Sequence, residues 1–132
     1  MRSVVADASV LVEYLFRTPR GSTIARMFEA PDTAVHVPAL CDVEVASVVR
    51  RALNGKRLSE TRASEAIQDY LELPIARHGH SALLGRMLQL RENFAAYDAT
   101  YVALAERLNA ELVTTDGALA RAVLAHTDVV VL

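Results

Sequence analysis

Short apolar and β-branched runs alternate with longer helical patterns along this chain, and the alternation limits the fold more than any other feature of the sequence. Parallel neighbouring strands cannot be joined by tight turns, and helices are the usual long connection. The pattern therefore predicts an α/β protein with a parallel sheet and helices on both of its faces. The expected strands are residues 3–6, 35–37, 73–76, 112–114 and 128–131, and the expected helices are residues 9–16, 22–29, 40–53, 59–71, 81–92, 97–108 and 118–124.

Length and composition predict one globular domain. The chain has 132 residues, 52% of them hydrophobic, and no repeat or linker marks a second unit, so the domain is expected to span residues 1–132. The single cysteine, Cys41, cannot form an internal disulfide. No apolar run approaches the ~20 residues that a membrane helix needs. A soluble cytoplasmic protein without a membrane association is therefore expected.

Two acidic residues come at or near the ends of predicted strands. Asp7 comes directly after the apolar run of residues 4–6, and Asp116 follows the strand at residues 112–114 within the sequence TTDG. A carboxylate beside a buried strand loses hydration, which costs several kcal/mol unless something compensates it. Ligands of open parallel sheets bind beyond the carboxyl ends of the strands, where both acids are expected. The alternative interpretation is local, with Asp7 capping the next helix and Asp116 capping a turn.

Two further acids are placed on apolar helix faces. Glu44 has Leu40 four residues before it and Val48 four residues after it, so it shares their side of the helix. Asp98 begins a helix, residues 97–108, that is apolar nearly all round and is therefore expected to be buried. Capping of the helix start, or a pair with a nearby arginine, is the alternative interpretation for Asp98.

The four acids together favour a metal site. Carboxylates crowded in one place repel one another, and some would hold protons unless a cation neutralises them. Mg²⁺ and Mn²⁺ prefer carboxylate oxygens and water and need neither histidine nor cysteine. A site of this kind is typical of metal-assisted phosphoryl chemistry.

The sequence resembles the PIN-domain nucleases, in particular the VapC toxins of bacterial toxin–antitoxin systems. The resemblance rests on VVADASVLVEYL, VPALCDVEVASVVRRAL and AAYDATYVALAERLNAELVTTD, and it extends over the whole chain. Matched residue by residue, the acids of the family are Asp7, Glu44, Asp98 and Asp116. The implied fold is a three-layer α/β/α sandwich with a parallel sheet of four to five strands in the order 3-2-1-4-5. Relatives commonly carry asparagine where this chain has Ser47. Serine is also polar but reaches less far, so the difference affects a contact with the substrate.

The resemblance implies an endoribonuclease that depends on Mg²⁺ or Mn²⁺ and acts as a toxin. Asp7 and Asp98 would be the principal ligands, with Glu44 and Asp116 completing the acidic site, and either of these two could orient the attacking water. In the family, polar residues often support such a site, and Ser9, Thr114 and Thr115 stand at the matching positions. The hydroxyls of Ser9 and Thr115 are expected to hold the ligands in place. The implied partners are a cognate VapB-type antitoxin, the RNA substrate and a second copy in a homodimer. Apolar faces on residues 22–29 and 59–71 could bind the antitoxin.

A basic stretch is the candidate for RNA binding. Arg50, Arg51, Lys56 and Arg57 could contact phosphates, although a solvated helix surface explains such a run equally simply. The net charge of −2 is unusual for a nucleic-acid-binding protein, but four acids gathered in one site would leave a slightly basic surface. Aromatic residues make up only 5% of the chain, so RNA specificity is expected to come from shape and phosphate geometry. The tyrosines are interpreted as core or interface residues.

Other functions fit the sequence less well. A phosphatase with an aspartate nucleophile would need a second aspartate where Ser9 stands, and a receiver domain would need a suitably placed lysine, whereas Lys56 is the only one. The remaining alternative is a catalytically weak or inactive PIN-like module that acts by protein or RNA binding. The presence of all four acids argues against it, because a binding module does not need repelling charges in one place.

Overall fold

A four-stranded parallel sheet forms the centre of the molecule. The computed structural model describes all residues, Met1–Leu132. The strands are β1 (Arg2–Ala6), β2 (Thr33–Pro38), β3 (Ile75–His78) and β4 (Glu111–Val113), in the order β3-β2-β1-β4. The predicted order is confirmed, while the fifth strand is reduced to a single parallel bridge between Leu112 and Val131.

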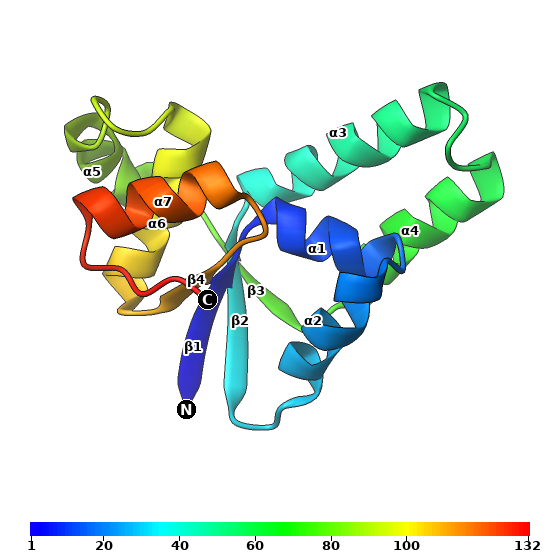
Figure 1. Cartoon of the computed structure of the whole chain (residues 1–132), viewed down its shortest axis with the longest axis horizontal. Helices are drawn as coiled ribbons and strands as arrows, with labels where there is room; N and C mark the ends of the chain where they lie inside the picture. The colour runs from blue at the N-terminus through cyan, green and yellow to red at the C-terminus, as the bar shows by residue number, and fades with distance from the viewer.

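Helices lie on both sides of this sheet, which confirms the three-layer α/β/α arrangement (Figure 1). The connections from β1 to β3 place four helices on one side, and the segments after β3 place three on the other. This is the arrangement that right-handed crossovers produce when the winding reverses between β1 and β4. The helices are α1 (Ala8–Leu15), α2 (Pro19–Glu29), α3 (Leu40–Asn54), α4 (Glu60–Glu72), α5 (Leu84–Gln89), α6 (Ala96–Leu108) and α7 (Gly117–His126).

Two elements differ from the sequence-based expectation. Strand β3 begins two residues late, at Ile75, because Pro74 has no N–H to donate to the sheet. The helix expected over residues 81–92 is broken into a 3₁₀ turn (Ser81–Leu83) and the short helix α5. It ends at Gln89, and the side chains of Leu90 and Phe94, which come after it, are buried in the core.

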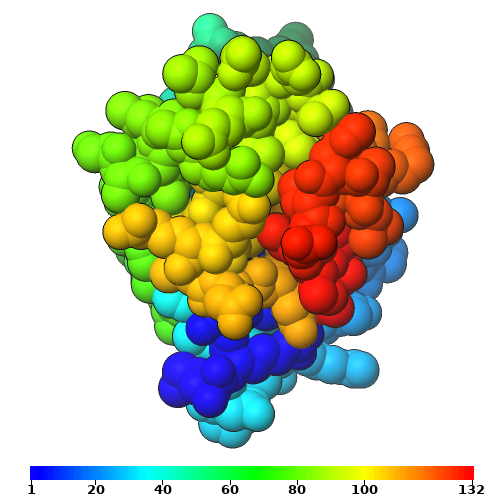
Figure 2. Space-filling model, turned by 90° about the vertical axis from the view of Figure 1, so that its left-hand side faces the viewer, coloured from blue at the N-terminus to red at the C-terminus, as the bar shows by residue number.

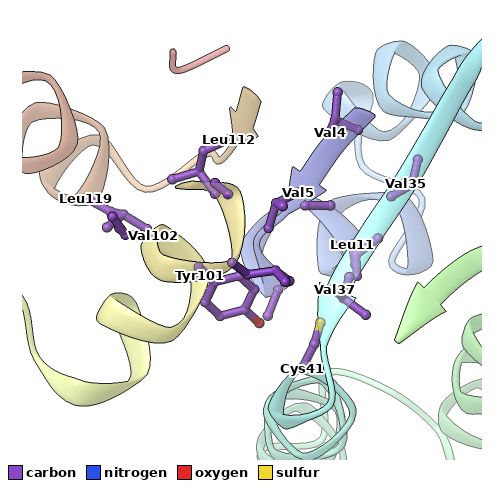
Figure 3. Close-up of a cluster of buried hydrophobic side chains, with 14 of the residues drawn as sticks. Val4, Val5, Leu11, Val35, Val37, Cys41, Tyr101, Val102, Leu112 and Leu119 are labelled. Atoms are coloured by element: carbon purple, nitrogen blue, oxygen red, sulfur yellow. The ribbon is translucent and has the colours of Figure 1, made fainter. Parts of the chain in front are cut away.

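Helix α6 is the centre of the hydrophobic core. Residues 99–105 are all buried, which confirms the expectation that this helix is apolar nearly all round. Figure 3 shows Tyr101 of α6 close to Val5 of β1 and Val102 beside Leu119, with the Tyr101 hydroxyl on the side of the ring that faces Cys41. Burial raises the pKa of the Cys41 thiol to about 11, so this cysteine is a packing residue and not a nucleophile.

The C-terminal segment closes the sheet beside β4. The Leu112 N–H donates to the Val130 carbonyl, and the Leu132 N–H donates to the Leu112 carbonyl, each at 2.8 Å. Figure 2 shows this segment lying beside the end of α6 and β4 on the face formed by α5, α6 and α7. None of the helices combines the length and the apolar character that crossing a bilayer would require.

Candidate functional site

A cavity of about 1070 Å³ lies at the carboxyl ends of the strands, where the winding of the sheet reverses. Strands β1 and β4 are neighbours, with Val5 opposite Leu112, so the acids that follow them lie at the same edge of the sheet. All four predicted acids line this cavity: Asp7, Glu44, Asp98 and Asp116. Helices α1, α3 and α6 and the loop between β4 and α7 supply its walls. The sheet therefore brings together residues from four distant parts of the sequence.

Asp7 does not cap the helix that follows it. Its backbone occupies the position before α1, but its side chain makes no capping hydrogen bond. Instead, Asp7 Oδ2 accepts hydrogen bonds from Ser9 Oγ at 3.0 Å and from Thr114 Oγ1 at 2.7 Å. Asp7 is 8% exposed. Its other oxygen, Oδ1, accepts no hydrogen bond from the protein and is still accessible to solvent. One oxygen of this carboxylate is thus held in place while the other faces the cavity.

The threonine that contacts Asp7 is Thr114, whereas Thr115 contributes only its backbone. Thr114 is at the end of β4, so its hydroxyl reaches across to the end of the neighbouring strand β1. The Thr115 N–H donates to Ser9 Oγ at 3.1 Å, and no hydrogen bond of the Thr115 hydroxyl occurs. The side-chain hydrogen bond to Asp7 is therefore made by the Thr114 hydroxyl and not by the Thr115 hydroxyl.

Asp116 caps helix α7 as well as lining the cavity. Its Oδ1 accepts hydrogen bonds from the backbone N–H groups of Ala118 at 3.0 Å and Leu119 at 3.2 Å. The alternative interpretation of Asp116 as a local cap is therefore true of one oxygen. The second oxygen makes no hydrogen bond with the protein and remains available to a ligand.

Glu44 is held by a tyrosine that the sequence analysis interpreted as a core or interface residue and not as part of the site. The Tyr101 hydroxyl donates to Glu44 Oε1 at 2.6 Å. Burial raises the pKa of Glu44, the hydrogen bond from Tyr101 opposes that rise, and the charges of Asp7 and Asp98 add to it. Glu44 is thus half-buried, hydrogen-bonded and within the electrostatic field of two other acids.

Asp98 lies in the first turn of α6, and its side chain has no hydrogen-bond partner in the protein. Burial raises the pKa of its carboxyl first, followed by the charges of Asp7 and Asp116. The arginine pair considered for Asp98 does not occur, and none of the five ion pairs of the molecule includes one of the four acids. The negative charge of the cavity is therefore not neutralised by salt bridges.

The donor chemistry fits a hard divalent cation held partly through water. Mg²⁺ is usually bound in proteins by one or two carboxylates and keeps several of its waters. No three acidic, histidine or cysteine side chains lie close enough together to ligate one ion directly. The cavity has room for water between the acids, and free carboxylate oxygens of Asp7 and Asp98 line it. The four acids are therefore suited to a hydrated ion and not to a closed cage of protein ligands.

The four basic residues expected to bind RNA lie in different parts of the surface and not in one cluster. Arg51 lines the cavity from the last turn of α3 and is its only lysine or arginine. Arg50 lies on the groove between α3 and α4, and Lys56 and Arg57 lie in the turn that follows α3. All four side chains are exposed, and none forms an ion pair.

Three residues of the cavity were missed as site residues in the sequence. Glu13 lies four residues after Ser9 on α1, a spacing that could have placed it on the same face. His80 follows β3, and its Nε2 accepts a hydrogen bond from the Leu40 N–H at 3.0 Å, at the beginning of α3. Tyr97 is 67% exposed beside Asp98, so of the two interpretations of the tyrosines, core or interface, it is not a core residue.

A second cavity, of about 510 Å³, lies between α1, α2 and the end of α4. Ala25 and Phe28 of α2 line it together with Asp69 and Glu72 of α4. These are the two helices whose apolar faces were considered for antitoxin binding.

Comparison with known proteins identifies a family. The sequence model of the PIN domain matches residues 4–123. The chain is 37% identical over 118 residues to "Ribonuclease VapC12" of Mycobacterium tuberculosis, covering 89% of this chain and 90% of that protein. Among solved structures, PAE2754 from Pyrobaculum aerophilum matches with a TM-score of 0.75 at 18% identity, covering 98% of this chain and 83% of that one. VapBC2 from Rickettsia felis, bound to a DNA fragment from its promoter, matches with a TM-score of 0.73 at 11% identity, covering 98% and 97%.

Proposed function

The chain belongs to the PIN-domain family, and from that premise we propose that it is a metal-dependent endoribonuclease of the VapC type, the toxin of a toxin–antitoxin pair. The observation that carries the proposal is the cavity at the β1–β4 reversal, which four carboxylates line without a salt bridge to neutralise them. The similarity to a VapC ribonuclease at 37% identity over most of both chains supports the same activity. On the same premise, residues 1–132 form a single PIN domain around one hydrophobic core.

Asp7 and Asp98 are the proposed principal ligands of Mg²⁺ or Mn²⁺, with Glu44 and Asp116 acting directly or through water. A divalent ion held by these residues would supply a bound water of lowered pKa and positive charge to balance the negative charge on the phosphate oxygens. Ser9 and Thr114 fix the orientation of Asp7 through hydrogen bonds of 3.0 and 2.7 Å. Such supporting hydrogen bonds limit the positions that a ligand oxygen can adopt.

Glu44 is the better candidate to orient the attacking water. Asp116 Oδ1 is occupied by two backbone N–H groups of α7, so this carboxylate cannot turn without uncapping the helix. The carboxylate of Glu44 has a single protein donor, the Tyr101 hydroxyl, on Oε1, and Oε2 remains free to accept from a water. This supports the assignment of the water-orienting role to Glu44.

RNA phosphates are the proposed ligands of the basic residues at the end of α3. Arg51 would contact the substrate inside the cavity, and Arg50, Lys56 and Arg57 would contribute sequence-independent attraction outside it. Lowering the salt concentration should therefore tighten RNA binding.

A VapB-type antitoxin and a second copy of the chain are the proposed protein partners. The similar structure from Rickettsia felis is named VapBC2, that is, a VapC together with a VapB. This name supports the proposal that the present chain also binds a VapB-type antitoxin. The cavity between α2 and α4 offers a partly apolar surface for it. Coexpression with the product of the adjacent small gene, followed by pull-down, should recover a complex, and sedimentation should report a dimer. Recovery of the chain alone, as a monomer, would contradict both assignments.

The test of the function is cleavage of purified RNA. Wild-type protein should cut total RNA with Mg²⁺ or Mn²⁺ and stop when the metal is chelated. Asp7→Asn and Asp98→Asn should remain folded and lose cleavage. Asp128→Asn makes the same chemical change at an exposed position outside the cavity and should cleave like wild type. Cleavage that persists in chelator, or in both site variants, would reject the proposal.

The alternative function is an inactive PIN-like module that acts by binding. A module without catalysis would not need the unneutralised acids, so metal titration separates the two functions. Calorimetry that detects Mn²⁺ binding to wild type and not to Asp98→Asn supports the enzyme, and the absence of binding supports the module.

A further inference from the structure

We propose that Tyr97 is a stacking site for an unpaired nucleobase of the RNA substrate, at the mouth of the acidic cavity. This inference rests on the proposed ribonuclease function and adds a base-binding position to it. Aromatic residues make up only 5% of the chain, which is too few for a broad stacking platform, but a single well-placed ring is sufficient for one base.

Tyr97 is exposed in a way that the other tyrosines are not. Its side chain is 67% exposed, whereas Tyr70 and Tyr101 are 3% and 1% exposed. Tyr97 nevertheless lines the cavity, because it directly precedes Asp98 at the beginning of α6. An aromatic ring is thus presented to solvent beside a proposed metal ligand, where it does not contribute to the core.

The chemistry of the Tyr97 side chain favours a base over a phosphate at this position. The Tyr97 ring carries no positive charge, and the neighbouring Asp98 forms no ion pair, so no cationic side chain contacts a phosphate there. A nucleobase is neutral and offers a flat π-face, which stacks on tyrosine regardless of sequence. Val43, which is 70% exposed on α3, also lines the cavity and adds apolar surface to it.

Phosphate contacts have a separate place in the same cavity. Glu44, Ser47 and Arg51 lie on one face of α3, and all three line the cavity. Arg51 lies about 10 Å beyond Glu44 along the helix axis, at 1.5 Å per residue. The cation that could attract the RNA backbone therefore stands apart from the acids, while the aromatic ring stands next to one of them.

Fluorescence offers a direct test, because the chain contains no tryptophan and Tyr97 is its most exposed tyrosine. Binding is measured in an Asp7→Asn background, which prevents cleavage, with a short single-stranded oligoribonucleotide of mixed sequence. The background protein should show quenched tyrosine emission on binding. Adding Tyr97→Phe should remove the quenching and keep the affinity, and adding Tyr97→Ala should weaken binding roughly 5- to 150-fold. Leu88→Ala, an exposed apolar residue of α5 outside the cavity, is the control and should change neither.

Three outcomes would overturn the proposal. Tyr97→Ala could bind and be quenched like the control, which would show that Tyr97 does not contact RNA. It could lose dimerisation in sedimentation, or lose the antitoxin in pull-down, with RNA affinity unchanged, which would assign the ring to a protein interface. Failure of the proposed function is distinct, because wild-type protein would then bind with quenching and yet cleave no RNA in Mg²⁺.

Discussion

The Tyr101 hydroxyl donates a 2.6 Å hydrogen bond to Glu44 Oε1, and this contact links the centre of the core to the acidic cavity. Tyr101 is 1% exposed, so its ring cannot move away without disturbing the packing of α6. The tyrosine therefore acts as a positioning residue for the proposed water-orienting carboxylate.

Tyr101→Phe should keep the fold and lower kcat by roughly 10- to 100-fold, because a carboxylate that is free to turn is misplaced for its task. KM should change little, because Tyr101 is buried away from the RNA. The hydrogen bond from Tyr101 opposes the raised pKa of Glu44, so its loss should raise that pKa further and shift the acidic limb of the pH–rate profile to higher pH.

Tyr70→Phe is the matched control for this variant. Tyr70 is also buried, and its hydroxyl donates to a carboxylate, Asp42, that does not line the cavity. Its pH–rate profile should coincide with that of wild type. An unshifted profile in Tyr101→Phe as well would show that the contact does not tune Glu44.

Asp98→Asn should raise the melting temperature by a few degrees while abolishing cleavage. The pKa of Asp98 is raised in the folded state by burial and by Asp7 and Asp116. As pH increases, the unfolded chain therefore releases this proton at a lower pH than the folded protein does. Above the ordinary carboxyl pKa, and at neutral pH, ionisation of Asp98 thus lowers the free energy of unfolding. In acid, where Asp98 is protonated in both states, it has no such effect. Differential scanning calorimetry at neutral and acidic pH should show the gain at neutral pH only.

The same variant tests the metal through stability. An ion that binds only the folded protein stabilises it by about 2.7 kcal/mol at one hundred times its Kd. Mg²⁺ should therefore raise the melting temperature of wild type and leave that of Asp98→Asn almost unchanged. Equal shifts in the two proteins would place the ion elsewhere.

Much of the site was predictable because it follows from strand order. The strand pattern placed Asp7 and Asp116 at the carboxyl ends of strands, the family resemblance implied that the first and fourth strands are neighbours, and Val5 does pair with Leu112. Glu44 and Asp98 stood out because acids on apolar helix faces are costly. The contact between Tyr101 and Glu44 was not predictable, because 57 residues separate them and Tyr101 reads as an ordinary core residue. The exposure of Tyr97 escaped for the same reason, since spacing along α6 does not show which residues of its first turn the core leaves uncovered.

Thr114→Val should weaken metal binding by roughly 10- to 100-fold, because it removes the hydroxyl that orients Asp7 and keeps the shape of the side chain. Thr115→Val is the control. It retains the backbone N–H that donates to Ser9, so its metal affinity should equal that of wild type. Mn²⁺ titration by calorimetry measures both. The reverse order of effects would return the supporting role to the Thr115 hydroxyl.

Two substitutions at Asp116 should separate its capping role from its charge. Asparagine can still accept hydrogen bonds from the Ala118 and Leu119 N–H groups, so Asp116→Asn should retain stability and lose most of the cleavage activity. Asp116→Ala removes the cap as well and should lower the free energy of unfolding by about 1 kcal/mol. Urea denaturation measures the stability, and cleavage of total RNA measures the activity. If Asp116→Asn cleaved normally and only Asp116→Ala were impaired, Asp116 would be a structural cap, and the acidic site would consist of Asp7, Glu44 and Asp98.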